Sequence, residues 1–189
     1  MTDALTPANQ LTLLRMLLIP AFVILVVYGH LGWALVVFAT AGITDGLDGL
    51  IARRSGQKTR LGAWLDPMAD KLLLVTAFVV LTIPGLGLAN RLPIWLTVLI
   101  ISRDVVIVLT VTIVNLAIGP RTFKPSIFGK TATATYIVTA VVAMLFNYLQ
   151  YHSVVVDVCV YASLAITLVS SLHYIWYAAR IIDAPRAAS

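Results

Sequence analysis

Apolar residues run in long segments along this chain, and polar residues gather in short runs between them. This pattern predicts helices over residues 11–28, 33–51, 62–83, 94–118, 130–149 and 154–181. Each helix has about 20 residues, which at about 1.5 Å per residue suffices to cross a bilayer core of roughly 30 Å. A Pro/Gly-rich segment at 84–93 and a basic segment at 119–130 separate neighbouring helices. We therefore expect an all-α polytopic membrane protein, with six transmembrane helices in one bundle and a single domain over 1–189.

Composition supports a membrane protein over a soluble one. Hydrophobic residues make up 60% of the 189 residues, the mean hydropathy is +0.98, and only 11% of residues are charged. Soluble domains carry about 25% charged residues. The net charge of +5 comes from basic residues near helix ends, where they suit anionic headgroups and phosphates, so we expect no nucleic-acid partner.

The basic residues also predict an orientation. With the N-terminus inside, the loops at 52–61 and 119–130 and the C-terminal tail are cytoplasmic, and only Arg91 falls in an outer loop. Lys and Arg concentrate on the cytoplasmic side of membrane proteins. We expect an integral protein of a bacterial cytoplasmic membrane whose polar cavity faces the cytoplasm.

Cysteine and histidine carry little chemistry in this sequence. Cys159 stands alone in an apolar run, which excludes a disulfide framework and indicates a small buried hydrophobe. His30, His152 and His173 are scattered, so we expect them in packing or interfacial positions rather than as metal ligands. No Ser, Cys or His stands beside the aspartates of residues 44–70 as a clear nucleophile.

Half of the eight acidic residues fall in one run, residues 44–70, between two predicted helices. An aspartate at the centre of a membrane helix costs roughly 2.5–3.5 kcal/mol, so four need water or cations. Asp45 and Asp48 are three residues apart, and Asp66 and Asp70 are four apart, so each pair shares a helix face. Carboxylates suit Mg²⁺ or Mn²⁺, and two such ions are a common device for displacement at phosphorus.

The run fits the pattern D-x2-D-G-x2-A-R-x8-G-x3-D-x3-D in full. Its elements are Asp45, Asp48, Gly49, Ala52, Arg53, Gly62, Asp66 and Asp70. It resembles the signature of the CDP-alcohol phosphatidyltransferase family. The resemblance implies transfer of a phosphatidyl group from CDP-diacylglycerol to an alcohol with release of CMP, and it implies a homodimer among membrane lipids.

The resemblance also implies roles for individual residues. All four aspartates would hold the two ions, and Asp70 matches the family's general base. An N-terminal pattern, Asn9-x2-Thr12-x2-Arg15, is similar to a family element, although Ala8 separates Pro7 from Asn9 here. The residues that the resemblance places on the CDP donor are Asn9, Thr12, Gly49, Ala52, Arg53, Thr59 and Gly62.

The acceptor alcohol is less defined. The segments LDPMADK, ISRDV and KPSIFGK are similar to the glycerol-phosphate and cardiolipin branches of the family. Basic residues that would suit an acceptor phosphate are Arg103, Arg121, Lys124 and Lys130. We favour glycerol 3-phosphate, which gives phosphatidylglycerophosphate, over phosphatidylglycerol, which gives cardiolipin.

Several polar residues inside the predicted helices are harder to interpret. Arg103 and Asp104 are neighbours whose side chains leave a helix about 100° apart, so we judge a local pair awkward and expect a functional role for Arg103. Asn9 is a candidate N-cap of the first helix. Arg15, Asp157 and His173 stay without an assigned role.

Two functions of other classes use aspartates in membranes. A membrane prenyltransferase would need two aspartate motifs farther apart than Asp48 and Asp66 and more helices. A cation transporter would place its aspartates near the bilayer midplane and show no dependence on a nucleotide. The absence of a nucleophile beside the aspartates favours direct displacement over a covalent phosphatidyl-enzyme.

Overall fold

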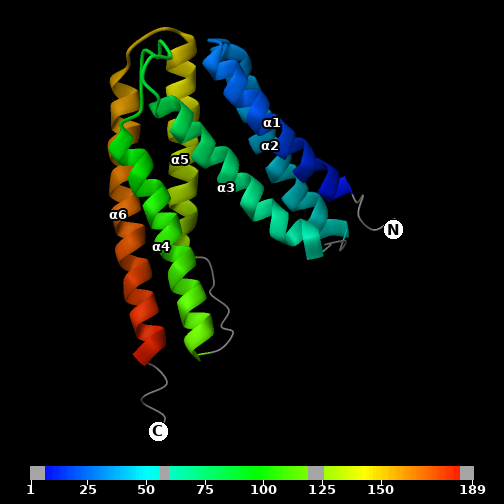
Figure 1. The fold of residues 1–189 in the computed structure, drawn as a ribbon, viewed down its shortest axis with the longest axis vertical. Coiled ribbons are helices and arrows are strands. Elements are labelled where there is room, and N and C mark those ends of the chain that lie inside the picture. Colours follow the sequence, from blue (N-terminus) through cyan, green and yellow to red (C-terminus); the bar gives the residue numbers. More distant parts are fainter. Residues whose placement is uncertain (1–6, 56–59, 119–125, 184–189) are drawn as a thin grey trace. The chain divides into compact units, whose positions relative to one another are not determined.

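The computed structural model describes residues 7–55, 60–118 and 126–183, and within them it describes no side chains for 7–12, 45–55, 60–68, 70, 114–115, 117–118, 178–179 and 181–183. The described residues form helices joined by short turns, without strands (Figure 1). The helices are α1 (Pro7–Val27), α2 (Leu31–Ser55), α3 (Arg60–Thr82), α4 (Ile94–Ile118), α5 (Ile127–Tyr148) and α6 (Val154–Asp183).

The apolar pattern predicted these helices closely. The range of α4 agrees with the prediction at both ends, and α5 starts three residues before the predicted 130. The candidate N-cap is wrong, because α1 already begins at Pro7 and Asn9 lies inside its first turn. Proline at the first position of a helix fits there, since its missing N–H has no intrahelical acceptor.

Two helices end in the same hydrogen-bonded motif. After α1, Gly29 has a φ of 78°, and the His30 and Gly29 N–H groups donate to the Leu25 and Val26 carbonyls. After α5, Gln150 has a φ of 52°, and the Tyr151 and Gln150 N–H groups donate to Phe146 and Asn147. This is the Schellman pattern, which satisfies the last helical carbonyls and turns the chain sharply.

The chain divides into two compact units. The first unit comprises Met1–Leu92 and Ala140–Ser153, and the second comprises Pro93–Thr139 and Val154–Ser189. The division falls inside α5, whose first part belongs to the second unit and whose last part belongs to the first.

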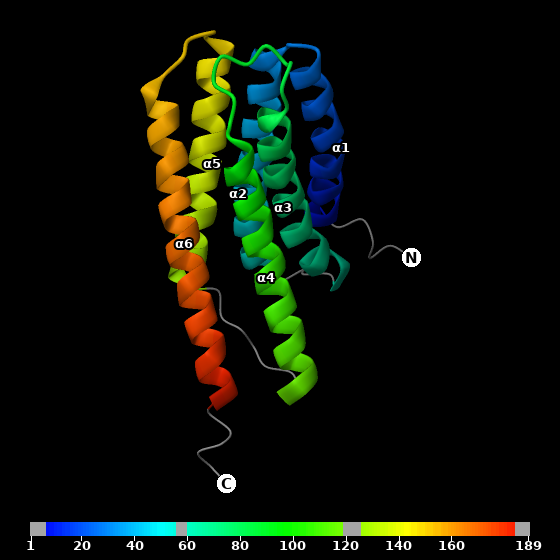
Figure 2. The same ribbon diagram turned by 60° about the vertical axis from the view of Figure 1, so that its left-hand side comes forward.

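In the first unit, α1 packs along α2 and α3, and α2 also touches α3 (Figure 2). The rings of Phe22 and Phe38 lie 5.8 Å apart between α1 and α2. Gly32 lies so close to Tyr148 that a Cβ atom there would meet the ring at 2.8 Å, so only glycine fits without a shift. Beside this contact, a groove of about 640 Å³ is lined by residues that include His30, Trp33, Val36 and Leu145.

One asparagine ties the turns at this end of the first unit together. Asn90 is buried, and its backbone N–H donates to the Asn147 side chain at 2.6 Å while its carbonyl accepts from the Asn147 amide at 3.1 Å. Its own amide donates to the Tyr151 carbonyl, and its Oδ1 accepts from the Ser153 N–H and pairs with the His152 ring. Buried polar groups need such full pairing, so this network fixes the 84–93 segment against the end of α5.

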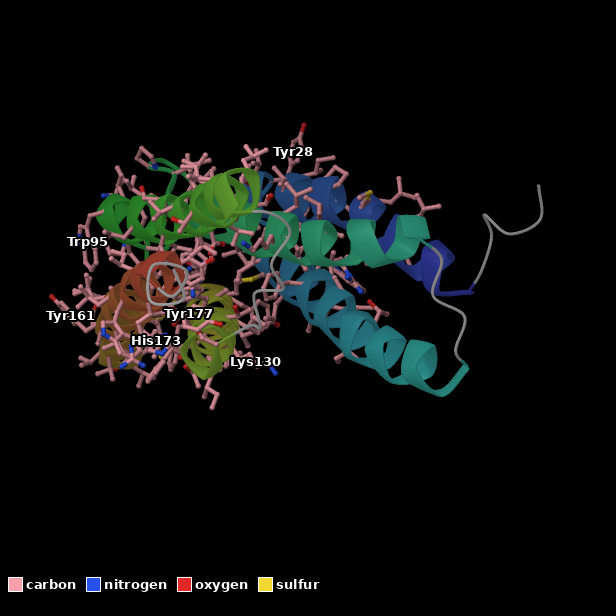
Figure 3. All side chains as sticks on the ribbon, turned by 90° about the horizontal axis from the view of Figure 1, so that it is seen from below. Tyr28, Trp95, Lys130, Tyr161, His173 and Tyr177 are labelled. Carbon is pink, nitrogen blue, oxygen red and sulfur yellow. The ribbon has the colours of Figure 1, made fainter. Side chains whose placement is uncertain are left out.

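In the second unit, α4 and α6 pack side by side, and their outer faces are apolar. Leu109, Ile113 and Leu116 of α4 are exposed, and Trp95 of α4 and Tyr161 of α6 extend outward from their helices (Figure 3). An exposed apolar face with aromatic side chains is typical of a surface in contact with lipid.

Three helices in the described residues are long and apolar enough to cross a membrane: Ile94–Ile113, Ile127–Tyr148 and Val154–Tyr177. Shorter apolar stretches occupy Leu13–Val27, Leu31–Thr44 and Lys71–Thr82. The protein is thus an all-helical membrane protein, whereas a bundle of six spans with a cytoplasmic cavity stays a prediction.

Candidate active site on helices α2 and α3

The backbone places the four aspartates on two antiparallel helices of the first unit. Asp45 lies ten residues before the end of α2 at Ser55, and Asp70 lies ten residues after the start of α3 at Arg60. Asp48 and Asp66 lie seven and six residues from the same two ends. At about 1.5 Å per residue, the aspartates form two matched levels, about 10 and 15 Å from the loop that joins the helices.

The donor set fits divalent magnesium or manganese. Carboxylate oxygens are the preferred ligands of both ions, and each level receives one aspartate from each helix. Among the side chains that the structure describes, no three His, Cys, Asp or Glu residues come together, and the four carboxylates lie outside that set. The aspartate run therefore stays the predicted metal site.

The predicted donor contacts follow the same two helices and α1. Gly49, Ala52 and Arg53 lie in the last part of α2, Gly62 lies in the first turn of α3, and Asn9 and Thr12 lie in the first turns of α1. The side chains at these positions are outside the described part of the chain. Thr59 lies wholly outside the described residues. These assignments stay predictions.

Arg103, the acceptor-phosphate candidate in α4, is paired in the structure. Its Nη1 donates to Asp104 at 2.8 Å and its Nη2 to the Ser170 hydroxyl at 2.6 Å, and its side chain is 8% exposed. Our expectation that neighbouring residues pair awkwardly is therefore wrong. A long, flexible arginine side chain can fold back along the helix, although the two Cβ directions differ by about 100°.

The surroundings of Arg103 explain this arrangement. It lines a hollow of about 250 Å³ between α4 and α6 whose other walls are mainly apolar, including Val106, Ile107 and Leu168. A lone guanidinium is costly there, and a carboxylate at hydrogen-bond distance lowers that cost. A Cβ atom at Gly129 would lie 3.5 Å from Arg103 Nη2, so the start of α5 also packs against this group.

The other acceptor candidates lie near the start of α5. Lys130 is exposed in its first turn (Figure 3). Ser126 precedes α5, and its hydroxyl accepts from the Gly129 N–H at 3.0 Å, which is an N-cap contact. Arg121 and Lys124 lie outside the described residues.

The unassigned polar residues in α6 have separate surroundings. The His173 ring lies 4.8 Å from Phe128 and stacks over Tyr177 at 6.5 Å, so it packs among aromatic side chains (Figure 3). Asp157 is exposed in the first turn of α6, where a carboxylate favours the helix N-terminus. Cys159 is free and half-buried, and its carbonyl accepts from Thr139.

Our sequence analysis missed a row of hydroxyl groups between α5 and α6. Thr139 and Ser163 share a hydrogen bond of 2.8 Å, and Tyr136 and Thr167 share one of 2.6 Å. The residues of α6 recur at intervals of three or four, as Ser163, Thr167 and Ser170, which is the available signal in the sequence. Such hydrogen bonds hold membrane helices together.

Paired aspartates on two adjacent helices of a membrane protein would suit an enzyme that binds divalent cations and acts on a lipid-linked diphosphate. A family model described as CDP-alcohol phosphatidyltransferase matches residues 5–179. The chain therefore belongs to this family and is a transferase of phospholipid biosynthesis. The family uses CDP-diacylglycerol and an alcohol acceptor in membrane lipids, and membership of this family argues against the transporter and prenyltransferase alternatives.

Relatives carry two kinds of name. A Mycobacterium tuberculosis protein named "Probable phosphatidylglycerophosphate synthase" is 36% identical over 190 residues, which cover 95% of this chain and 84% of the relative. Human "Cardiolipin synthase (CMP-forming)" is 36% identical over 162 residues, covering 76% and 52%. The protein of that name from Streptomyces coelicolor is 35% identical over 135 residues, covering 68% and 60%.

Proposed function

We propose that this enzyme transfers the phosphatidyl group of CDP-diacylglycerol to glycerol 3-phosphate, which gives phosphatidylglycerophosphate and CMP. The observation that carries the proposal is the matched pair of aspartate levels on α2 and α3 within a family match over nearly the whole chain. The mycobacterial relative named as a phosphatidylglycerophosphate synthase aligns over 95% of this chain, more than either cardiolipin synthase does.

The aspartates would perform the chemistry together. Two divalent ions, Mg²⁺ or Mn²⁺, would neutralise the diphosphate and stabilise the charge that develops as CMP leaves. Asp45, Asp48, Asp66 and Asp70 would hold these ions. Asp70 would also accept the proton of the attacking acceptor hydroxyl.

The remaining polar positions would bind the two substrates. Asn9, Thr12, Gly49, Ala52, Arg53, Thr59 and Gly62 would contact the CDP part of the donor. Lys130, Arg121 and Lys124 would attract the acceptor phosphate. We keep Arg103 among the acceptor candidates. Because Nη1 donates to Asp104 and Nη2 to Ser170, Nε and the other unpaired N–H groups are the donors that would be left for a phosphate.

The charge pattern and the family also support a membrane topology, an orientation and an assembly. We propose six spans, the aspartate site and its cavity on the cytoplasmic side, and a homodimer in a bacterial cytoplasmic membrane. The reaction would proceed by direct displacement, because no nucleophile accompanies the aspartates.

Competition between acceptors tests this proposal. The purified enzyme, supplied with CDP-diacylglycerol and Mn²⁺ and with equal concentrations of glycerol 3-phosphate and phosphatidylglycerol, should form phosphatidylglycerophosphate as the main product. A donor that is chiral at the transferred phosphorus should react with inversion. Cardiolipin as the main product would contradict the acceptor assignment and favour the second candidate, and retention would contradict direct displacement.

A further inference from the structure

The hollow between α4 and α6 in the second unit is bordered by two side chains that each hold an unpaired polar atom. Arg103 of α4 and Tyr174 of α6 both line this space of about 250 Å³. Among the described residues, neither Arg103 Nε nor the Tyr174 hydroxyl has a hydrogen-bond partner, and both atoms are buried. A buried donor without an acceptor is costly. The hollow is a space from which a ligand could supply the missing acceptor oxygen.

The walls of the hollow suit hydrocarbon. Val106, Leu168 and Ile175 line it, and all three are exposed in the structure. Thr167 and Ser171 also line it, but their hydroxyls donate to carbonyls of α6 itself. An ordered water needs about two to four polar partners, whereas a space with mainly apolar walls stays dry or takes an apolar group. The ligand therefore combines an apolar chain with a few acceptor oxygens.

Depth along α6 indicates which oxygens these are. The apolar stretch of α6 ends at Tyr177, and Tyr174 lies three residues before that end. Ser170, which accepts from Arg103, lies seven residues before it. At about 1.5 Å per residue, the two positions are about 5 and 10 Å inside the apolar stretch. A lipid phosphate lies in the headgroup region outside the hydrocarbon core, whereas the ester carbonyls lie at the edge of the core.

The charge at the hollow also favours a neutral acceptor. Asp104 lies 2.8 Å from Arg103 Nη1 and balances its charge, so a ligand meets hydrogen-bond donors without a net charge. An ester carbonyl needs no further counterion there. It would use Nε, which leaves one further N–H on each of Nη1 and Nη2 for an acceptor phosphate.

We infer that the hollow between α4 and α6 binds one glycerophospholipid of the surrounding bilayer. One acyl chain would lie against Val106 and Leu168, and an ester carbonyl oxygen would accept hydrogen bonds from Arg103 Nε and the Tyr174 hydroxyl. Recognition would depend on the ester group and the chain, and not on the headgroup. The lipid would be a resident of the second unit and not a substrate.

Lipid exchange in detergent tests this site without turnover. The purified protein is stripped of lipid, kept in EDTA and mixed with dioleoyl-phosphatidylcholine or with its dialkyl ether analogue, which lacks the ester carbonyls. Native mass spectrometry measures the one-to-one adduct. The diester lipid should bind about fivefold more tightly than the ether lipid, as expected for the loss of a hydrogen-bonded carbonyl. Dioleoyl-phosphatidylserine should bind within about twofold of the phosphatidylcholine, because the site carries no net charge.

Three variants locate the bound lipid. Tyr174→Phe keeps the ring and removes the hydroxyl, so the preference for the diester lipid should fall to about twofold or less. Leu168→Trp places a larger side chain at the wall and should abolish the adduct with either lipid. Tyr161→Phe is the matched control, since Tyr161 extends outward from the same helix and is exposed (Figure 3). It should leave both affinities unchanged.

Three results would overturn the inference. Equal affinity of the unaltered protein for the diester and ether lipids would contradict recognition of the ester group. An unchanged preference in both Tyr174→Phe and Leu168→Trp would place the lipid outside the hollow. Loss of the adduct on addition of glycerol 3-phosphate would mean that the hollow belongs to the acceptor site and holds no resident lipid.

Discussion

The two units of this enzyme differ in where their charged residues lie. In the second unit, Arg103 is neutralised by its neighbour Asp104, and four residues form a row of hydroxyls between α5 and α6: Tyr136, Thr139, Ser163 and Thr167. In the first unit, the four aspartates of the run at 45–70 lie on α2 and α3, and Arg15 of α1 is buried. The second unit therefore neutralises Arg103 within its own helix, whereas we propose that the aspartates of the first unit hold divalent cations.

Hydropathy reflects the same difference. Helices α4, α5 and α6 contain apolar stretches of 20 to 24 residues, while the described parts of α2 and α3 contain the shorter stretches Leu31–Thr44 and Lys71–Thr82. An apolar helix is stabilised by lipid and needs few polar contacts. A helix with clustered carboxylates depends on ions or on substrate, and this difference predicts where a substitution alters chemistry and where it alters stability.

The largest effect is expected from a change in the first unit. Asp45→Asn should lower kcat by about 100-fold or more, because one ligand of the proposed cation site loses its charge. The Tm in EDTA should change little or rise. Thr44→Val is the matched control, since the Thr44 hydroxyl donates only to the Ala41 carbonyl of its own helix. Near-normal turnover of Asp45→Asn with CDP-diacylglycerol and Mn²⁺ would contradict a role of Asp45 in the proposed cation site. The distinction between a catalytic first unit and a structural second unit would then fail.

An intermediate effect is expected from the ion pair of the second unit. Asp104→Ala should destabilise the protein by about 2 kcal/mol, because it leaves a mostly buried guanidinium without its carboxylate. The kcat of the enzyme that stays folded should remain within about twofold of the unaltered value. The reason is that this ion pair stabilises the fold and does not contribute to transition-state stabilisation. Denaturation in detergent, with the exposed Asp157→Asn as a control, measures the stability. A loss of kcat without a loss of stability would place Asp104 in the chemistry.

The smallest effect is expected from the hydroxyl row. Thr139→Val should cost about 0.6 kcal/mol, the average for hydrogen bonds between membrane helices. Thr139 is fully buried and bonds to Ser163, whereas Thr112 is exposed and bonds to the Val108 carbonyl in its own helix. Thr112→Val should therefore leave the stability unchanged in the same denaturation experiment. Equal effects of the two substitutions would mean that the row adds nothing beyond helix packing.

The helices and the aspartate run could be predicted from the sequence, because both depend on local patterns. Hydropathy marks where a helix can lie in lipid, so the ends of α4 were predicted correctly. The spacing of Asp45 to Asp48 and of Asp66 to Asp70 sets their helix faces without any tertiary contact.

The remaining contacts could not be predicted because they depend on three-dimensional packing. The pairing of Arg103 depends on a side-chain conformation that a helical wheel ignores. The bond between Tyr136 and Thr167 requires the register of two separate helices. The network around Asn90 joins residues about sixty positions apart, and asparagine in a Pro/Gly-rich loop carries no sign of burial.

The Asn90 network also determines where this enzyme can be labelled. One amide and its backbone hold the 84–93 segment at several points, so an insertion beside residue 90 would separate partners that lie up to 63 positions away. Gly85 and Gly87 have open space around them within the same segment. A short epitope or a fluorophore is therefore best attached between those two glycines, where it would report on membrane sidedness and leave both α2 and α3 untouched.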